Sequence, residues 1–212
     1  MRYKFGLVRC NRNCAEYKAI RDRHYIPNHG AVGQQMHYLI CMKDDVIGII
    51  SGGASAYSVK CRDDYFGITK DNRDVALNGI VDNTVFRLEM NLPNLGTQIL
   101  RAWRKQVAID WQKKYGVRVA GFETFIIENE RRKGALYKAD NWQFVGVTSG
   151  SSKFHSNGIE NPQKRVQTVQ KLVFCKRIDG VSLPTVYFSN WKTPNIVRGQ
   201  ISFFEGGGGA IE

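Results

Sequence analysis

The 212-residue sequence has no run of 18 or more apolar residues, and its longest apolar stretches, such as Val46–Ile50, are only as long as a strand. A membrane-spanning helix needs about 20 such residues, so none is predicted. The first residues include no apolar segment of the kind that secretory signals contain. The composition is not that of a disordered chain, a collagen-like repeat or a coiled coil. These absences predict a globular, cytoplasmic protein.

Acidic residues are few: 19 Asp and Glu stand against 31 Lys and Arg, which gives a formal net charge of +12. A compact domain this basic repels itself, and such an excess usually serves a polyanionic partner. The partner classes are nucleic acid, an anionic lipid surface and a phosphate-rich cofactor; a basic surface kept for solubility is the alternative. Because the sequence has no lipidation motif and no basic amphipathic anchor, we predict a nucleic-acid partner and no membrane.

The five cysteines are an odd number and, without a secretory signal, predict reduced thiols. Cys41 and Cys175 lie in apolar, strand-like runs and are expected in the core. Four other residues have a spacing close to that of a zinc finger: Cys10, Cys14, His24 and His29. The nine residues between the second Cys and the first His are too few for a finger, and no apolar finger core lies between them. A structural zinc is therefore the weaker hypothesis, and the identity of any metal stays open.

The hydrophobic pattern predicts an α+β or mixed α/β fold. Two apolar, β-rich runs, 36–42 and 46–51, flank a short polar turn and predict an antiparallel hairpin. Residues 79–90 predict a strand, after which apolar residues at helical spacing predict a long helix that begins after Asn94 and ends before Gly116. The other expected elements are short helices at 17–23, 70–77 and 131–139, strands at 117–127, 141–148 and 169–177, an extended segment at 65–68, a loop at 149–165 and edge strands at 186–188 and 200–204.

We expect a single domain over residues 1–204, with its core at about 20–150 and C-terminal strands within 166–204, followed by a flexible tail at 205–212. The start of the long helix is a candidate cofactor site, because helix N-termini present unpaired N–H groups and a positive dipole to anions. Its residues are Asn94, Leu95, Gly96 and Thr97.

Arg87 is the first candidate functional residue, because strand alternation places it on one face with the apolar Val81 and Val85. A buried Arg must be paired or hydrogen-bonded, and its forked guanidinium suits a carboxylate or a phosphate. A structural role would pair it with Glu89 or Glu123. A functional role would make it a clamp for a phosphate or for the carbonyl of a donor.

Glu123 and Tyr137 are candidates for proton transfer. Glu123 lies among aromatic residues of an apolar strand, where a carboxyl group can have a raised pKa and act as a base. The alternative is that it pairs with an Arg of the core. The Tyr137 hydroxyl can act as a general acid toward a leaving group, and ordinary packing of its ring is the alternative.

Basic and aromatic residues predict a nucleic-acid surface. The basic candidates are Arg131, Arg132, Lys133, Lys164, Arg165 and the Arg and Lys face of the long helix. The aromatic candidates for base stacking are Trp142, Phe144, Phe154 and Trp191.

Several short motifs occur together within residues 20–150. They are His24-Tyr25, Phe86-Arg87, Pro93-Asn94 and the run Gly134-Ala-Leu-Tyr137-Lys-Ala139-Asp-Asn141-Trp142, which leads into a strand with Gly146. Through these motifs the sequence resembles the Mom DNA-modification proteins of bacteriophages, which are relatives of the Gcn5-type N-acetyltransferase fold. It is also similar to a domain of the Druantia anti-phage defence system.

The resemblance implies a Gcn5-related N-acetyltransferase-like fold with a central, mostly antiparallel sheet flanked by helices. It also implies an enzyme that transfers a carbamoylmethyl, glycinamide-like group to the exocyclic N6 of adenine in double-stranded DNA, which protects phage DNA from restriction in the bacterial cytoplasm. His24, Tyr25, Arg87 and Tyr137 would be catalytic. The family's Asp-Pro after the third core strand is replaced here by Ile126-Ile127-Glu128-Asn129, so either Glu128 or Glu123 would supply the carboxylate.

The donor stays open. Acetyltransferases of this fold use a Gly-rich turn to cradle the pyrophosphate of coenzyme A, whereas this sequence has Asn91-Leu-Pro-Asn-Leu-Gly96-Thr97 there. A CoA thioester and a glycyl ester of tRNA are the two donors considered. The alternative functions are a non-catalytic nucleic-acid-binding defence module on the same fold and an N-acetyltransferase for another amine.

Overall fold

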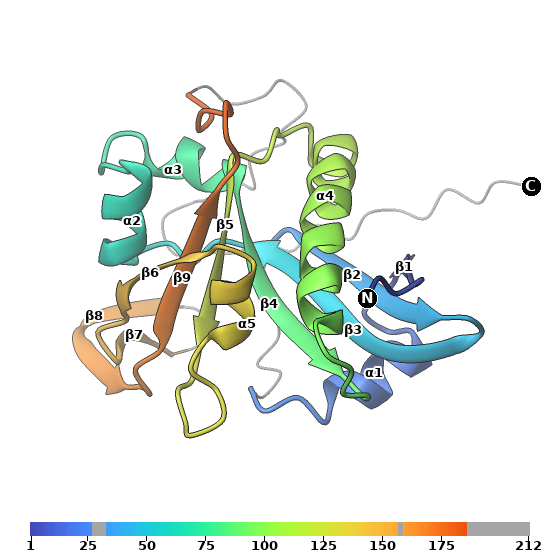
Figure 1. Cartoon of the computed structure of the whole chain (residues 1–212). Coiled ribbons are helices and arrows are strands. Elements are labelled where there is room, and N and C mark those ends of the chain that lie inside the picture. Colours follow the sequence, from blue (N-terminus) through green and yellow to red (C-terminus); the bar gives the residue numbers. More distant parts are fainter. Residues whose placement is uncertain (27–32, 157–158, 186–212) are drawn as a thin grey trace, which may run out of the picture.

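The computed structural model of the chain describes residues 1–26, 33–156 and 159–185, and only the backbone of those between 151 and 167. Its main feature is a seven-stranded sheet in the order β1-β2-β3-β4-β5-β9-β6 (Figure 1). The strands are β1 (Gly6–Cys10), β2 (Gln35–Met42), β3 (Asp45–Ala54), β4 (Ile80–Leu88), β5 (Gly121–Ile126), β9 (Leu172–Arg177) and β6 (Gln143–Val147). All neighbours are antiparallel except β4 and β5, which are parallel. This confirms the predicted fold class and the predicted hairpin.

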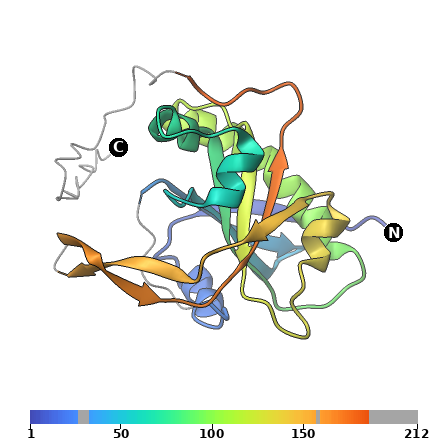
Figure 2. The same ribbon diagram turned by 90° about the vertical axis from the view of Figure 1, so that its left-hand side faces the viewer.

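Helices cover both faces of the sheet (Figure 2). They are α1 (Ala15–Arg21), α2 (Lys60–Phe66), α3 (Arg73–Ala76), α4 (Leu95–Tyr115) and α5 (Ala135–Ala139), and a 3-10 turn, Leu77–Gly79, follows α3. The faces are separated by strand alternation: Ile49 packs with α1, whereas its neighbour Ile50 packs with α4. Among the described residues, no helix is both long enough and apolar enough to cross a bilayer.

The long helix α4 forms as predicted, because its apolar residues recur every three or four positions and fall on one side. Ile99, Trp103 and Trp111 are completely buried. Gly52 of β3 makes room for this packing, since a Cβ there would lie 2.8 Å from Val81 and 3.3 Å from Trp103. The helix ends at Gly116, whose φ of 71° is the left-handed conformation that favours glycine.

Several expectations were wrong. The segment 65–68 is not extended, because α2 includes Tyr65 and Phe66, and the 149–165 segment is not a loop but contains β7 (Ser151–Ser156) and much of β8 (Ile159–Gln167). These two strands pair with each other, and that pairing leaves no hydrophobic signal in a polar sequence. Strand β1 was missed because it is an edge strand whose residues are mostly exposed and do not alternate.

Other elements are shorter than expected. The strand expected at 117–127 begins at Gly121, and only α5 and α3 form within the helices expected at 131–139 and 70–77. The expected edge strands at 186–188 and 200–204 lie outside the described residues. The single domain over 1–204 and the flexible tail at 205–212 stay a prediction.

Strand β4 contains a β-bulge at Thr84. Ser51 of β3 pairs with Val85, whereas the next residue, Gly52, pairs with Asn83, so Thr84 is the extra residue. A bulge inverts the facing of every residue that follows it. Accordingly, Val81 packs under α4, but Val85 packs under α1. The predicted alternation, which placed these two valines on one face with Arg87, is therefore wrong beyond the bulge.

The parallel strands β4 and β5 are joined over only part of their length. The paired residues are Ile80 with Gly121, Val81 with Phe122 and Asp82 with Glu123. Beyond this junction the two strands diverge, as Figure 1 shows, and a wedge opens between them.

Candidate active site

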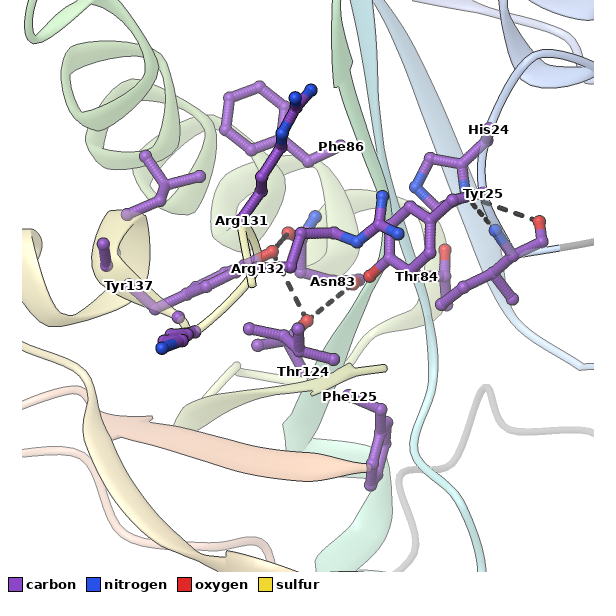
Figure 3. A pocket seen from close by; sticks show the side chains of 16 residues that line it. His24, Tyr25, Asn83, Thr84, Phe86, Thr124, Phe125, Arg131, Arg132 and Tyr137 are labelled. Carbon is purple, nitrogen blue, oxygen red and sulfur yellow. Dashed lines mark hydrogen bonds between the residues drawn. The ribbon is translucent and has the colours of Figure 1, made fainter. Parts of the chain in front are cut away.

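A pocket of about 210 Å³ lies in the wedge between β4 and β5 (Figure 3). Its walls come from both strands, from the segment after α1 and from the segment that leads into α5. It brings together six of the predicted site residues, which are His24, Tyr25, Arg131, Arg132, Lys133 and Tyr137. It also contains three polar residues that the sequence analysis missed: Asn83, Thr84 and Thr124.

The Tyr137 hydroxyl is held in the wedge by both strands. It donates a hydrogen bond of 2.7 Å to the Asn83 side-chain oxygen, and the Thr124 hydroxyl lies 3.4 Å away. Thr124 also donates to the Asn83 backbone carbonyl at 3.1 Å, which ties β5 to β4 beyond their last pairing. Burial raises the pKa of Tyr137, so its hydroxyl keeps its proton at neutral pH.

Asn83 connects this network to the bulge. Its side-chain nitrogen donates to the Ser51 carbonyl at 3.0 Å and to the Val85 carbonyl at 3.3 Å. All of the amide's polar atoms therefore have partners, and its oxygen is fixed toward Tyr137. A signal for this residue was present in the sequence, because a polar amide in a strand rich in β-branched residues needs a partner when it is buried.

The Gly134-to-Trp142 motif fixes α5 on the sheet. Gly134 has φ of 75°, and a Cβ there would lie 2.3 Å from the Phe174 ring. The Trp142 indole donates to Asp140 at 2.9 Å, and Arg104 of α4 forms two hydrogen bonds with the same carboxylate. Trp142 is 4% exposed, so the prediction that it stacks on a base is wrong. The motif instead explains how the ring of Tyr137 reaches the wedge.

His24 and Tyr25 form one wall of the pocket, with their rings 4.6 Å apart. The His24 Nδ1 accepts a hydrogen bond of 3.2 Å from the Ile26 backbone N–H. Burial lowers the pKa of His24 to about 4, so the ring is neutral at pH 7. The Ile26 carbonyl oxygen also lies 3.4 Å from Nδ1, and the two contacts suit different tautomers of the ring. In the tautomer that accepts from the Ile26 N–H, Nε2 carries the ring proton and can donate to a ligand.

Three cations border the pocket, and none of them has a carboxylate partner within the described residues. Among the residues that the structure describes, no carboxylate lies within ion-pair distance of Arg131, Arg132 or Lys133. The Arg132 guanidinium lies 4.0 Å from the centre of the Tyr25 ring, and its Nε is buried without a hydrogen-bond partner. A buried guanidinium atom without a partner is costly, so this arrangement favours an anion supplied from outside.

Arg87 does not line the pocket but fastens one of its walls. Its Nε donates to Glu89 at 2.6 Å and its Nη1 to the Arg23 backbone carbonyl at 2.6 Å, while Arg23 itself pairs with Glu89 at 2.9 Å. Of the alternatives in the sequence, the pair with Glu89 is the one present. The expected burial is wrong, because the Arg87 side chain is 32% exposed. Its bond to Arg23 holds the residue that immediately precedes His24.

Neither predicted carboxylate lies in the pocket. Glu128 is exposed, and Glu123 faces the opposite side of the sheet, where it pairs with Arg62 at 2.7 Å with both side chains completely buried. Glu123 also accepts a hydrogen bond from the Ala56 backbone N–H at 3.1 Å. Glu123 thus pairs with an Arg of the core, as one alternative predicted, and that Arg is Arg62 rather than Arg87. No Asp or Glu is among the described residues that line the pocket.

The turn before α4 does not provide a pyrophosphate cradle. Leu95 is completely buried, and a Cβ on Gly96 would lie 3.0 Å from a methyl group of Leu136, so this glycine packs against α5. Asn94 adopts φ of 60° and forms no side-chain cap. The residues from Asn94 to Thr97 therefore do not fit the Gly-rich turn that holds the pyrophosphate of coenzyme A.

The remaining candidates either lie away from the pocket or fall outside the described residues. Among the described residues, no three His, Cys, Asp or Glu side chains are placed to bind a metal ion, and His29 lies outside them. Cys14 instead donates to Glu16 at 2.8 Å. The side chains of Phe154, Lys164 and Arg165 and the whole of Trp191 are outside the described part of the chain. Phe144 is 48% exposed on β6 but does not line the pocket.

Comparisons with known proteins agree with this fold. A GNAT family acetyltransferase from Elizabethkingia anophelis with acetyl-CoA bound is 8% identical, with a TM-score of 0.51 over 82% of this chain and 98% of that one. A Bacillus subtilis acetyltransferase in complex with CoA is also 8% identical, with a TM-score of 0.52 over 82% of this chain and 99% of that one. At such identities the likeness shows the fold alone, and it confirms the predicted acetyltransferase-like architecture.

No curated protein matches the chain. A protein-family model, that of the Druantia protein DruA, matches residues 1–175. This match confirms the resemblance to the Druantia domain, whereas the resemblance to the Mom proteins stays a prediction. Since the match extends over most of the chain and includes every segment that forms the pocket, the chain belongs to the family of the Druantia protein DruA.

Proposed function

We propose that the chain is a DNA-modifying transferase of the acyl or acyl-like class that acts on the exocyclic N6 of adenine in double-stranded DNA. The transferred group is a carbamoylmethyl, glycinamide-like unit. The observation that carries the proposal is the protonated Tyr137 hydroxyl, held in a pocket whose cations have no carboxylate partner among the described residues. The net charge of +12 supports a nucleic-acid substrate.

The acceptor needs a pocket of this kind. The N6 lone pair is delocalised into the ring, and in a duplex N6 is paired, so the base must leave the stack. A pocket of about 210 Å³ with aromatic and polar walls suits a single unstacked ring. Tyr25 and Phe86 supply apolar surface for the base, and Thr84 and His24 supply groups that hydrogen-bond to its edge.

Tyr137 accounts for the proton balance without a carboxylate. As N6 forms its new bond, the bond between the transferred group and the donor's leaving atom breaks, and Tyr137 gives its proton to that atom. The nitrogen then returns one proton to the Tyr137 oxygen. The net result moves a proton from N6 to the leaving group and leaves the tyrosine unchanged.

Two donors satisfy this proton balance, a CoA thioester and a glycyl ester of tRNA, and each would release a glycyl group through its carbonyl carbon. A glycyl group on N6 is an isomer of the carbamoylmethyl product. Attack of its free amine on C6, cleavage of the C6–N6 bond and passage of one proton from the amine to the released amide nitrogen convert the first into the second without loss of atoms.

The two similar acetyltransferase structures hold acetyl-CoA or CoA, which supports the CoA thioester. The closed turn at Gly96 supports the tRNA ester, because an aminoacyl ester needs no pyrophosphate cradle. In either case Arg131, Arg132 and Lys133 supply positive charge for phosphates at the mouth of the pocket.

Mass spectrometry of nucleosides tests the proposal. DNA from bacteria that express the protein is digested and compared with DNA from cells that express Tyr137→Phe. We expect a new, heavier deoxyadenosine only with the unaltered protein. An unchanged nucleoside profile in both would contradict the proposal.

A second function is favoured by one observation, the absence of any Asp or Glu from the described lining of the pocket. A non-catalytic nucleic-acid-binding defence module on the same fold needs no base. It predicts DNA binding that Tyr137→Phe leaves unchanged, together with an unmodified nucleoside profile.

A further inference from the structure

Two hollows continue from the pocket along the protein. The first, of about 260 Å³, lies between α1, β2 and β4, and the second, of about 540 Å³, lies between the ends of β1, β2 and α4. Thr84, the bulge residue, lines both the pocket and the first hollow. Arg12 and His37 line both hollows. The pocket and the two hollows therefore adjoin, and we call the two hollows together the side groove.

The charge of the side groove is almost entirely positive. Its basic residues are Arg9, Arg12, Lys18, Arg21 and Lys114, and its acidic residue is Asp22. Among the described residues, no carboxylate lies within ion-pair distance of Arg9, Arg12, Lys18 or Lys114. Outside the groove, an arginine such as the buried Arg62 does have a carboxylate partner. Four of the five groove cations thus have no carboxylate partner within the described part of the chain.

The floor of the groove is ordered by buried groups. The Ser51 hydroxyl lies 2.7 Å from the Tyr17 hydroxyl and 3.0 Å from the His37 Nδ1, and both Ser51 and Tyr17 are buried. This network fixes the His37 ring at the meeting point of the two hollows. The pKa of His37 is lowered to about 4 by burial and by the charges of Lys114, Arg12 and Arg21. A positive potential therefore acts at this point of the groove.

We propose that the side groove binds the phosphodiester backbone of the DNA strand whose base enters the pocket. The proposal rests on the proposed function, in which a nucleic-acid base is the acceptor. A single phosphate does not explain the arrangement, because Lys18 lines only the first hollow, whereas Arg9 and Lys114 line only the second. A chain of phosphates that starts at the pocket contacts them in succession.

Lys114 and its neighbour Lys113 provide a matched test. Both are exposed residues of the last turn of α4, but only Lys114 lines the groove. We would compare Arg12→Ala, Lys114→Ala and Lys113→Ala with the unaltered protein. The measurement is fluorescence anisotropy with a labelled single-stranded DNA of about 20 nucleotides, its duplex and the same sequence in RNA, over a range of salt concentrations.

Each groove variant is expected to weaken DNA binding several-fold. The slope of log affinity against log salt should become shallower by about 0.7–0.9 for each phosphate that the variant no longer binds. Lys113→Ala should stay within about twofold of the unaltered protein, because it leaves the groove intact. Equal effects in all three variants, or none, would overturn the proposal. So would a weakening that is confined to RNA.

Binding needs no catalysis, so this proposal and the proposed function fail separately. If the groove variants bind DNA like the unaltered protein, and the protein does modify adenine, the groove proposal is rejected and the proposed function is kept. If the groove variants no longer bind DNA, and the protein leaves nucleosides unchanged, the groove proposal is supported and the transferase function is rejected.

Discussion

Asp82 of β4 and Glu123 of β5 are opposite each other in the strand register and lie on the α2 side of the sheet. The next residues along these strands, Asn83 and Thr124, contact Tyr137 on the α5 side. On the α2 side, Arg62 pairs with Glu123 at 2.7 Å and with Asp63 at 2.6 Å. The charges there are neutralised within the protein. On the α5 side the polar groups of the strands are neutral, and the cations that border the pocket have no carboxylate partner within the described residues.

This difference shows how the junction of β4 and β5 provides a buried, ion-paired face on one side of the sheet and an open pocket on the other. The backbone pairing of β4 with β5 ends at Asp82 and Glu123, and Glu123 also forms the buried ion pair with Arg62. From the next residue the strands separate, and the Asn83–Thr124–Tyr137 network joins them. Substitutions on the α2 side should therefore affect stability first, and those on the pocket side should affect activity first.

The largest expected effect on stability is that of Arg62→Met. The variant leaves Glu123 buried without its partner, and breaking a buried ion pair by removal of one member costs about 3–5 kcal/mol. Denaturation in urea measures the free energy of unfolding. Lys60→Met, at an exposed position of the same helix, should change it by less than about 0.5 kcal/mol. The double variant Arg62→Met/Glu123→Met should recover part of the stability, and a decrease under about 1 kcal/mol in the single variant would contradict the comparison.

Tyr137→Phe should separate activity from stability. The variant leaves the Asn83 side-chain oxygen without its donor, so we expect a decrease of about 1–3 kcal/mol in the free energy of unfolding. Modification of adenine should be abolished, whereas DNA binding should stay within about twofold. Tyr57→Phe is the matched control, because the Tyr57 hydroxyl donates to Asp74 at an exposed site. Retained modification in Tyr137→Phe would assign the hydroxyl a structural role only.

Much of the architecture could be predicted from the sequence, because α4 and the hairpin of β2 and β3 have strong hydrophobic periods. The bulge at Thr84 could not, since nothing in the run from Ile80 to Leu88 shows where a residue leaves the ladder. That one displacement moved Arg87 from an expected buried face to a partly exposed one. Edge strand β1 and the β7–β8 pair were missed because backbone pairing forms these strands, and their sequences show no hydrophobic pattern.

The site was predicted in part for a similar reason. Tyr137 and Arg132 were found through motifs and charge, and the fold brings them together. Glu123 was correctly expected to be buried, but its partner, Arg62, lies 61 residues away and is joined to it only by tertiary structure. Asn83 was overlooked because its signal, an amide within a β-branched strand, matters only if the side chain is buried, and that burial is set by tertiary structure.

Arg87→Ala should reduce activity more than stability. Its pair with Glu89 is partly exposed, and such pairs contribute about 0–1 kcal/mol, so we expect a decrease below about 2 kcal/mol in the free energy of unfolding. Modification should fall because the Arg23 carbonyl loses its anchor next to His24. Arg23→Ala serves as the control, since it removes the other bond to Glu89 but keeps the backbone carbonyl. Full activity in Arg87→Ala, or a decrease of about 3 kcal/mol or more, which would be typical of a buried pair, would contradict this role.

The smallest expected effect is that of Asp82→Asn on the pH dependence of stability. Burial and the charge of Glu123 raise the pKa of Asp82 well above its usual range, and its Oδ1 has no hydrogen-bond partner among the described residues. The folded protein therefore holds a proton here more tightly than the unfolded chain does. The stability linked to this group is fully present below the unfolded pKa and is lost as pH rises through the folded pKa.

An Asn at position 82 imitates the protonated acid, so the variant should match the unaltered protein near pH 4 and exceed it in stability at about pH 7–8. His24 and His37 have the opposite dependence. Their pKa values are lowered to about 4, so their contribution is lost as pH falls from about 6.5 toward 4. Both histidines are present in both proteins, and their effect cancels when the two unfolding curves are subtracted at each pH. A difference that is flat across this range, or that grows toward acid, would show that Asp82 is charged in the folded protein and that the α2 side is not closed to solvent.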